Sequence, residues 1–477
     1  MKPKNKYEAK RGYNLKKTQE LDRLFSPSSI AIIGASQDKE KGGGFALNGL
    51  LEGGFKGKLY PINPKQTEIM GLKAYPSVLD VPEEVDEAII AVAARIVPRV
   101  MAECAQKGVK FAVVHSSGFS ELGAEGRELE KEMVQNAQQG GTRIVGPNCM
   151  GIYNGRVKLN TILTEAYLTG EPGSIAFIGQ SGWASENFIS RSYELGLRCS
   201  KVVSIGNQSD LTVEDFLEYF ATDAETKVIA CYVEGIKRGR EFLQLAKQIS
   251  PKKPIIVWKG GRTEAGVRLV ASHTGGLAGN SAVFDAAMKQ GGIVGARDFE
   301  ELLDLVMGFN SPVLPTGNRL GLIAEAGSGT VSGVDLSEEL GLEVPTLSPE
   351  TQKELDDAIE GMVMPTLTRQ NPVDLGWVTY DISPALHLQC ARIMAKDADA
   401  VVTLSYSHLD GQFATDLASL RDEVGKPIML VVGLPTLERE GMSLPVKKGI
   451  PTYTILQRAL KVLSAMVRYV DYRQQHS

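Results

Sequence analysis

The chain has 477 residues, of which 43% are hydrophobic and 23% charged, as in folded globular proteins. At a prior of roughly 150 residues per domain, this length predicts about three domains. The net charge of −5, from 52 basic and 57 acidic residues, argues against a general nucleic-acid binder.

Hydrophobic runs and cysteines exclude further classes. No apolar run approaches the roughly 18 residues that a membrane-spanning helix needs, and the N-terminus lacks the apolar core of a secretory signal. The five cysteines form no CxxC pair, so neither a disulfide framework nor a zinc ribbon is indicated. We therefore expect a cytoplasmic protein. The cysteines are Cys104, Cys149, Cys199, Cys231 and Cys390.

The first part of the chain alternates short apolar runs with helical periodicity. Residues 1–18 hold seven Lys or Arg and one acid, which predicts a solvated basic tail. Helical periodicity fills Pro98–Lys107 and Glu125–Gln138. Such alternation predicts βαβ units and a parallel sheet. The apolar runs expected to be strands are Ser29–Ile33, Lys58–Ile62, Ala88–Val92, Phe111–His115 and Arg143–Val145.

The same pattern begins again twice. A linker-like segment at 170–173 precedes "SIAFIGQSG", and a second at 312–317 precedes "RLGLIAEAGSG". Together with "SIAIIGAS", these openings predict three α/β domains, each with a strand, a glycine turn and a helix. Ligands of open parallel sheets bind at the carboxyl ends of the strands, where these turns lie. Further expected strands are Ser174–Ile178, Lys201–Ser204, Val228–Val233, Pro254–Trp258 and Arg319–Ile323.

The turn after the first strand differs from a dinucleotide fingerprint. Gly34, Ala35 and Ser36 do not match GxGxxG, and the second strand ends in Asn63, Pro64 and Lys65 instead of an acid. NAD needs that carboxylate for its ribose, whereas a lysine suits a phosphate. The pattern therefore favours a phosphorylated nucleotide, such as coenzyme A with its 3′-phosphate, over NAD.

Other polar residues follow strands of the same predicted sheet. Ser117, Gly118 and Asn148 stand at two later strand ends and are expected to line the same crevice, although ordinary turn chemistry also explains them. Lys39 and Lys41 are expected to be solvated loop residues.

His273 stands apart from the other histidines. None of the five is paired at metal-ligand spacing, so no metal site is predicted. His115 could contact a ligand or pack, and His387 and His408 are expected to be structural or surface residues. His273 precedes Gly275 and Gly276 in a loop whose backbone N–H groups could cradle an anion, with an ordinary surface loop as the alternative.

Two more segments of the second domain fit phosphate chemistry. Gln180, Ser181 and Gly182 open a helix after a strand, where unpaired N–H groups and the helix dipole bind phosphate. Glu234 ends another strand and could orient an imidazole, although a salt bridge explains it equally. A nucleophilic histidine, an anion cradle and a carboxylate suit phosphoryl transfer through phosphohistidine.

Motifs across the whole chain identify a family. The chain resembles the α subunit of ADP-forming acyl-CoA synthetases, relatives of succinyl-CoA synthetase, from about Leu21 to Arg473. The resemblance implies a Rossmann-like CoA-binding domain at 19–155 and two flavodoxin-like domains at 156–314 and 318–473. The motifs that carry it are "IAIIGAS", "YPINPK", "IVGPNCMG", "GQSG", "SHTGGLAG", "NPVDLG" and "GIPTYTILQRALKVL".

The resemblance also implies a reaction. Acyl-CoA, ADP and phosphate are converted reversibly to the acid, CoA and ATP, through acyl phosphate and a phosphohistidine at His273. Glu234 matches the carboxylate that steadies this phosphohistidine, and Ser181 and Gly182 match the helix start that holds the phosphoryl group. ADP or ATP, with magnesium, belongs to a partner β subunit with an ATP-grasp fold, in an expected α2β2 assembly.

Some residues depart from the family pattern. The third domain opens with "AEAGSGTVSG" instead of a more glycine-rich turn, and Trp183 replaces a small residue, so the acyl group stays open. No ATP-grasp segment is recognised in the chain. Three alternatives are retained: a CoA-binding regulatory or scaffold protein without catalysis, an NAD-dependent oxidoreductase, and a classical succinate–CoA ligase α subunit.

Overall fold

The computed structural model describes residues 15–162, 170–274, 281–376, 382–406, 411–433 and 440–476. Two compact units are present, each built from several stretches of chain. Unit 1 comprises Met1–Ile189, Cys199–Leu245 and Lys259–Phe284, and unit 2 comprises Ser190–Arg198, Ala246–Trp258 and Asp285–Ser477. Within the described ranges, no helix has both the length and the apolar character needed to cross a lipid bilayer.

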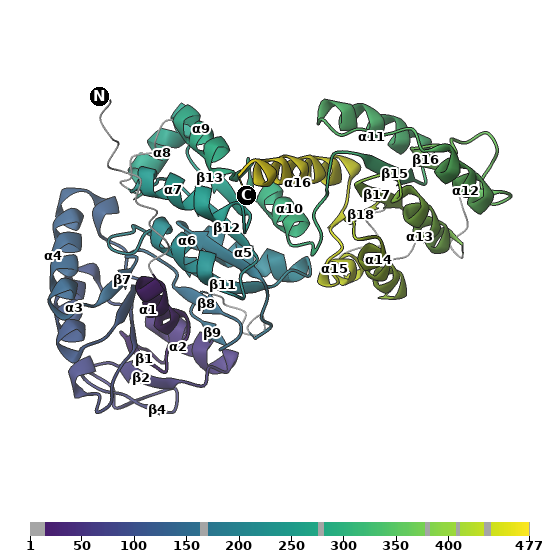
Figure 1. Cartoon of the computed structure of the whole chain (residues 1–477). Coiled ribbons are helices and arrows are strands. Elements are labelled where there is room, and N and C mark those ends of the chain that lie inside the picture. Colours follow the sequence, from purple (N-terminus) through teal and green to yellow (C-terminus); the bar gives the residue numbers. More distant parts are fainter. Residues whose placement is uncertain are drawn as a thin grey trace, which may run out of the picture. The chain divides into compact units, whose positions relative to one another are not determined.

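The first sheet is parallel and has the order β2-β1-β5-β6-β7. Helices α3 and α4 lie side by side (Figure 1). The five expected strands are confirmed to within two residues at either end. The elements are β1 (Ser29–Ile33), β2 (Lys58–Ile62), β5 (Glu87–Ile90), β6 (Phe111–Val114), β7 (Arg143–Val145), α1 (Leu15–Phe25), α2 (Gly42–Gly53), α3 (Val97–Lys107) and α4 (Ala124–Gly140), with a small hairpin of β3 (Glu68–Ile69) and β4 (Leu72–Lys73).

The second sheet has the order β14-β13-β12-β10-β11-β8-β9. Its strands β8 and β9 are antiparallel, unlike the all-parallel sheet that the sequence predicts. The link between them is a tight turn, which suffices for antiparallel strands, whereas parallel strands need a long crossover. The strands are β8 (Ile152–Asn154), β9 (Leu159–Asn160), β10 (Ile175–Gly179), β11 (Cys199–Ser204), β12 (Val228–Val233), β13 (Ile255–Lys259) and β14 (Val294–Ala296).

The helices of this part of the chain are α5 (Gly182–Glu194), α6 (Val213–Thr222), α7 (Gly239–Ile249), α8 (Glu264–Thr274), α9 (Ser281–Gly291) and α10 (Phe299–Phe309). From β10 onward these helices alternate with the strands, except that α8 and α9 are consecutive elements between β13 and β14.

The third sheet is parallel and has the order β16-β15-β17-β18-β19. Its strands are β15 (Leu320–Ala324), β16 (Val373–Asp374), β17 (Ala400–Ser405), β18 (Ile428–Val432) and β19 (Thr452–Tyr453). Its helices are α11 (Gly327–Glu339), α12 (Pro349–Ile359), α13 (Ser383–Met394), α14 (Gly411–Val424), α15 (Glu440–Lys447) and α16 (Leu456–His476).

Each sheet contains a strand, β1, β10 or β15, that has the next strand of the chain on one side and a later strand on the other. All three are fully buried and almost entirely apolar, as expected for parallel strands with a neighbour on both sides. Ligands of such sheets bind where the strand order reverses, at the carboxyl ends. The predicted α/β fold class is confirmed, while the domain boundaries stay predictions.

Candidate functional site

The first crevice lies at the carboxyl ends of β1 and β5. Gly34 has a φ of 90° and its N–H donates to the Ile62 oxygen at 3.0 Å. A Cβ atom at Gly34 would stand only 2.4 Å from the Ala91 oxygen, so only glycine allows this close approach of two strand ends. Asn63 Nδ2 donates to the Ala35 oxygen at 2.9 Å. The turns after β1 and β2 are therefore joined by hydrogen bonds.

Lysines around this crevice differ in their surroundings. Lys39 pairs with Glu52 at 2.8 Å and Lys41 lies 3.5 Å from Asp38, and all four side chains are exposed, as expected for solvated loop residues. Lys65 is also exposed, and its backbone N–H donates to Asn63 Oδ1 at 2.9 Å. Asn63 thus orients the turn that carries Lys65.

The ends of β6 and β7 are linked through backbone contacts. Asn148 N donates to the Ser116 oxygen at 2.9 Å, and Gly118 N donates to Glu121 Oε1 at 2.6 Å. Burial opposes ionisation of Glu121, yet hydrogen bonds from Asn207 and this backbone outweigh it and lower the pKa of the carboxyl. The carboxylate, rather than a ligand, therefore caps the loop that holds Ser117 and Gly118.

The second crevice lies between β10 and β12. Gln180 N donates to the Tyr232 oxygen at 3.0 Å, and Gln180 Oε1 accepts from Glu234 N at 2.7 Å and from Gly235 N at 3.2 Å. This side chain, predicted to bind phosphate, uses its oxygen to tie the two strand ends together.

Helix α5 begins at this crevice. Ala184 N donates to Ser181 Oγ at 3.4 Å, a weak cap of the first turn. A Cβ atom at Gly182 would lie 2.4 Å from Met150 Cγ, so the glycine lets the Met150 loop approach the helix start. Trp183 is 60% exposed, which excludes the buried packing role that most tryptophans have.

Glu234 is buried, with 8% of its surface exposed. Its Oε1 accepts from Tyr232 OH at 3.1 Å, whereas its Oε2 has no hydrogen-bond partner among the described residues. No ion pair to Glu234 is present in the described ranges, so the salt-bridge alternative lacks support. Burial, and next the charge of Glu234, raise the pKa of Tyr232, which keeps this hydroxyl a donor.

His273 lies in the last turn of helix α8 rather than in a loop. The prediction was wrong because it weighed the glycines that follow more than the helix-forming run that precedes them. The His273 side chain and the neighbouring Gly275 and Gly276 lie outside the described residues. Helix α8 contacts the short helix Ser120–Leu122 that follows β6. The helix that carries His273 therefore adjoins the first domain's crevice.

Sequence reasoning missed two residues at the carboxyl end of β13, Lys259 and Gly260. Lys259 is buried, and its Nζ donates to the Glu234 oxygen at 2.8 Å and to the Gly260 oxygen. A Cβ atom at Gly260 would lie 2.6 Å from Tyr232 OH. The available signal was the run "WKGG", a charged residue between an apolar strand and two glycines.

The third crevice carries a carboxylate where the second carries Gln180. Glu325 follows β15, accepts from Tyr406 N at 2.5 Å and contacts His387 Nε2 at 3.1 Å. His387 is fully buried and its Nδ1 lies 2.5 Å from Thr403 Oγ1. Burial opposes ionisation of Glu325, but the hydrogen bonds from His387 and Ser383 lower its pKa. The Glu325 carboxylate in this crevice is thus held by hydrogen bonds within the protein.

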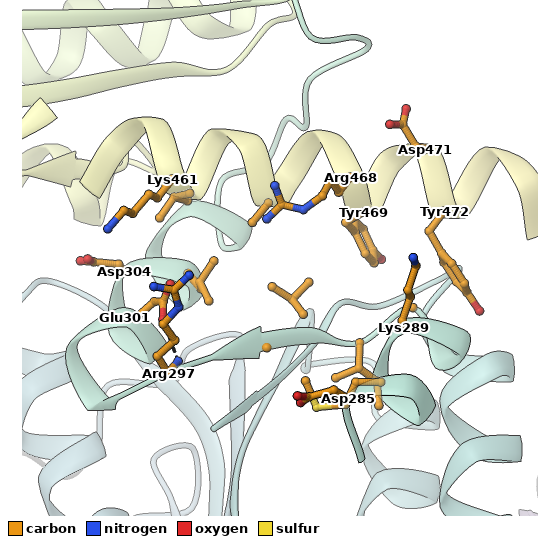
Figure 2. Close-up of a pocket in the computed structure, with 18 of the residues that line it drawn as sticks. Asp285, Lys289, Arg297, Glu301, Asp304, Lys461, Arg468, Tyr469, Asp471 and Tyr472 are labelled. Atoms are coloured by element: carbon orange, nitrogen blue, oxygen red, sulfur yellow. Dashed lines mark hydrogen bonds between the residues drawn. The ribbon is translucent and has the colours of Figure 1, made fainter. Parts of the chain in front are cut away.

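A large groove of about 1320 Å³ is lined mainly by residues of α9, β14, α10 and α16. Figure 2 shows Lys461 and Arg468 of α16 facing Arg297 and Glu301. Its charges are mixed, and none of the predicted site residues lines it. Throughout the described segments, no three His, Cys, Asp or Glu side chains are grouped to hold a metal ion.

Comparisons with known proteins assign the first and second sheets to two known domain families. Residues 28–155 match the CoA binding domain and residues 172–309 the succinyl-CoA ligase like flavodoxin domain. The chain is 38% identical, over 91% of its length and 94% of the relative, to "Acetate--CoA ligase [ADP-forming] II subunit alpha" of Pyrococcus furiosus. A second relative from that organism, "Acetate--CoA ligase [ADP-forming] I subunit alpha", is 36% identical over 96% of this chain and 99% of its own.

A solved structure is similar over the same extent. It is the "dinucleotide forming Acetyl-coenzyme A synthetase 1 in complex with phosphate and ADP" from Ca. Korarchaeum cryptofilum, with a TM-score of 0.84, 36% identity, and coverage of 95% of this chain and 97% of that one. Together these matches cover all three sheets, and the chain belongs to the family of ADP-forming acetate–CoA ligase α subunits.

Proposed function

We propose that this chain is the α subunit of an NDP-forming acyl-CoA synthetase, which converts acyl-CoA, ADP and phosphate reversibly to a carboxylic acid, CoA and ATP. The observation that carries the proposal is the buried Oε2 of Glu234, which has no partner among the described residues and lies at the β10–β12 switch point. A carboxylate oxygen held there is suited to accept the N–H of an imidazole.

The reaction divides into three displacements. Phosphate oxygen attacks the thioester carbonyl, the C–S bond breaks, and CoA leaves as its thiol with the released proton. A ring nitrogen of His273 then attacks phosphorus, and the P–O bond breaks to release the carboxylate. Finally, a β-phosphate oxygen of ADP attacks the same phosphorus, and the N–P bond breaks to give ATP and free histidine.

Each proposed residue has one role. Gly34, Ala35 and Ser36, with Asn63 and Pro64, shape the CoA crevice, and the exposed cation of Lys65 suits its 3′-phosphate. Ser117, Gly118 and Asn148 complete the crevice wall.

The phosphoryl site uses other groups. The N–H groups at Ser181 and Gly182, at the start of α5, stabilise the phosphoryl anion with the helix dipole, as do those at Gly275 and Gly276. Gln180 positions the end of β12. Glu234 accepts the ring N–H of His273 and favours its cationic, phosphorylated form.

The nucleotide requires a partner. We propose an ATP-grasp β subunit, in an α2β2 assembly, that binds ADP with magnesium; the metal neutralises charge on the nucleotide phosphates when bound. No residue of this chain is assigned to that ion.

The test is labelling of the purified chain with a panel of 32P-labelled acyl phosphates in the presence of CoA. The expected result is an acid-labile, base-stable label that is absent from His273→Ala. The best donor then identifies the acyl class. An absence of label with every donor, alone and with the candidate β subunit, while CoA still binds, would instead support a CoA-binding scaffold without catalysis.

A further inference from the structure

Lys259 is a buried cation without a carboxylate partner in the described segments. Only 3% of its surface is exposed, and its Nζ contacts two backbone oxygens, those of Glu234 and Gly260. Burying an unpaired charge is costly, so buried lysines are usually paired. The position therefore needs an explanation other than fold stability.

Lys201 provides a comparison within the same sheet. It is also buried, at 5% exposure, but its Nζ pairs with Asp223 and with Glu225, each at 2.9 Å. The chain thus neutralises a buried lysine where the role is structural. Lys259 instead stands beside the β12 end that carries Glu234.

The contacts of Lys259 fix the strand end that bears the proposed catalytic carboxylate. Its bond to the Glu234 oxygen and the Gln180 bond to Glu234 N hold both peptide groups of that residue. A lysine has three N–H donors, and the described residues use two of them through oxygen acceptors. The Phe284 ring lies 5.7 Å from Nζ and covers another side of the ammonium.

The charges around Glu234 also require a nearby cation once a phosphoryl group is present. A phosphoryl group on His273 would bring up to two negative charges toward the Glu234 carboxylate, and like charges in a buried site repel strongly. Burial lowers the pKa of Lys259, the Glu234 carboxylate raises it, and Arg262 lowers it again. The ammonium is therefore coupled electrostatically to the Glu234 carboxylate, whose backbone oxygen it also contacts.

We propose that Lys259 is a positioning residue that fixes the Glu234 strand end and supplies the buried positive charge that offsets the phosphoryl group beside Glu234. This inference rests on the proposed phosphohistidine function. It predicts that inorganic phosphate binds more weakly, by about tenfold, when the charge is removed.

Three substitutions in the full-length chain separate the positive charge of Lys259 from its hydrogen bonds to the two backbone oxygens. Lys259→Gln keeps an N–H donor for the two oxygens but removes the charge, Lys259→Met removes both, and Lys259→Arg keeps both. Lys247→Met, at an exposed lysine of α7, is the matched control. Affinity for inorganic phosphate is measured by calorimetry, and the half-life of the 32P label at His273 by chase.

The charge role predicts that the Gln and Met variants lose about tenfold in phosphate affinity, while the Arg variant and the control stay close to wild type. In the double variant Lys259→Gln with Glu234→Gln, phosphate affinity should recover, because the repelling carboxylate is gone. Wild-type affinity in a folded Lys259→Gln chain would overturn the inference. If Lys259→Met fails to fold, the Gln and Arg variants still show whether the charge of Lys259 contributes to phosphate affinity.

The two proposals fail separately. A wild-type chain that takes no label at His273, either alone or with the candidate β subunit, contradicts the proposed function. The phosphate affinities of the Gln and Arg variants still test the charge of Lys259. A wild type that is labelled, with equal label half-life and equal phosphate affinity in Lys259→Gln, contradicts the inference alone.

Discussion

The amide oxygen of Gln180 lies 2.7 Å from the backbone nitrogen of Glu234, and through this bond the turn after β10 holds the end of β12. The third sheet repeats the arrangement, because Glu325 after β15 accepts from Tyr406 N after β17 at 2.5 Å. The Gln180 side chain is uncharged, so it does not repel an anion from the second crevice. The carboxylate of Glu325, bonded to His387, adds a negative charge to the third.

Replacing Gln180 by Ala should weaken phosphohistidine formation by roughly tenfold, because two part-buried N–H groups lose their acceptor, at a cost of about 1–3 kcal/mol. The measurement is the initial rate of 32P labelling, with unfolding followed in urea. Asn187→Ala is the control, since Asn187, on the helix α5 that follows the Gln180 turn, makes an exposed bond to the Trp183 oxygen. Equal labelling rates in the two variants would contradict this role of Gln180.

Gly260→Ala should displace the Tyr232 hydroxyl, because the added Cβ would lie 2.6 Å from it. The bond from Tyr232 to Glu234 Oε1 is then lost, and overpacking of this kind costs about 1–3 kcal/mol. Denaturant unfolding measures the cost. Gly239→Ala is the control, since its Cβ would meet nothing within 4 Å. Adding Tyr232→Phe to Gly260→Ala should recover stability by removing the clashing oxygen; no recovery would argue against the clash.

Glu87 should make the fold less stable as the pH rises. Both carboxyl oxygens are fully buried without partners among the described residues, and burial raises the pKa well above its ordinary value of 4.5. Above that pH the unfolded chain has lost the proton that the native state keeps, so stability falls by about 1.4 kcal/mol per pH unit. Glu87→Gln should remove this slope in unfolding measured from pH 5.5 upward. An unchanged slope would show that Glu87 is ionised in the native protein.

His115 should act in the opposite direction. Its Nε2 is buried without a partner in the described ranges, and burial lowers its pKa from 6.5 to about 4. As the pH falls through 6.5, His115 becomes protonated in the unfolded chain but stays neutral in the native state. The free energy of unfolding therefore decreases by up to about 3 kcal/mol by pH 4. His115→Gln should lessen this acid sensitivity in thermal melts between pH 4 and 7. If the variant is as acid-sensitive as the wild type, His115 is not the group responsible for the loss of stability at low pH.

Local sequence patterns were sufficient to predict most of the strands and helices. The apolar runs at Ser29–Ile33 and Lys58–Ile62 are strands with those same ends, because buried parallel strands need continuous apolar residues. The glycine turn at Gly34 was also predictable, since its position between strand and helix marks a ligand crevice. The end of α8 was not, because helix propensity and the following glycines conflict near His273.

By itself, the sequence determined the α/β class, the three strand–turn–helix openings and the candidates His273 and Glu234, since each depends on residue type and local spacing. Only the tertiary structure decided that Gln180 accepts from the backbone nitrogen of Glu234 and that Lys259 donates to its backbone oxygen. These residues come from three strands that are distant in the chain. Strand order in the sheet, which local pattern does not encode, brings them together.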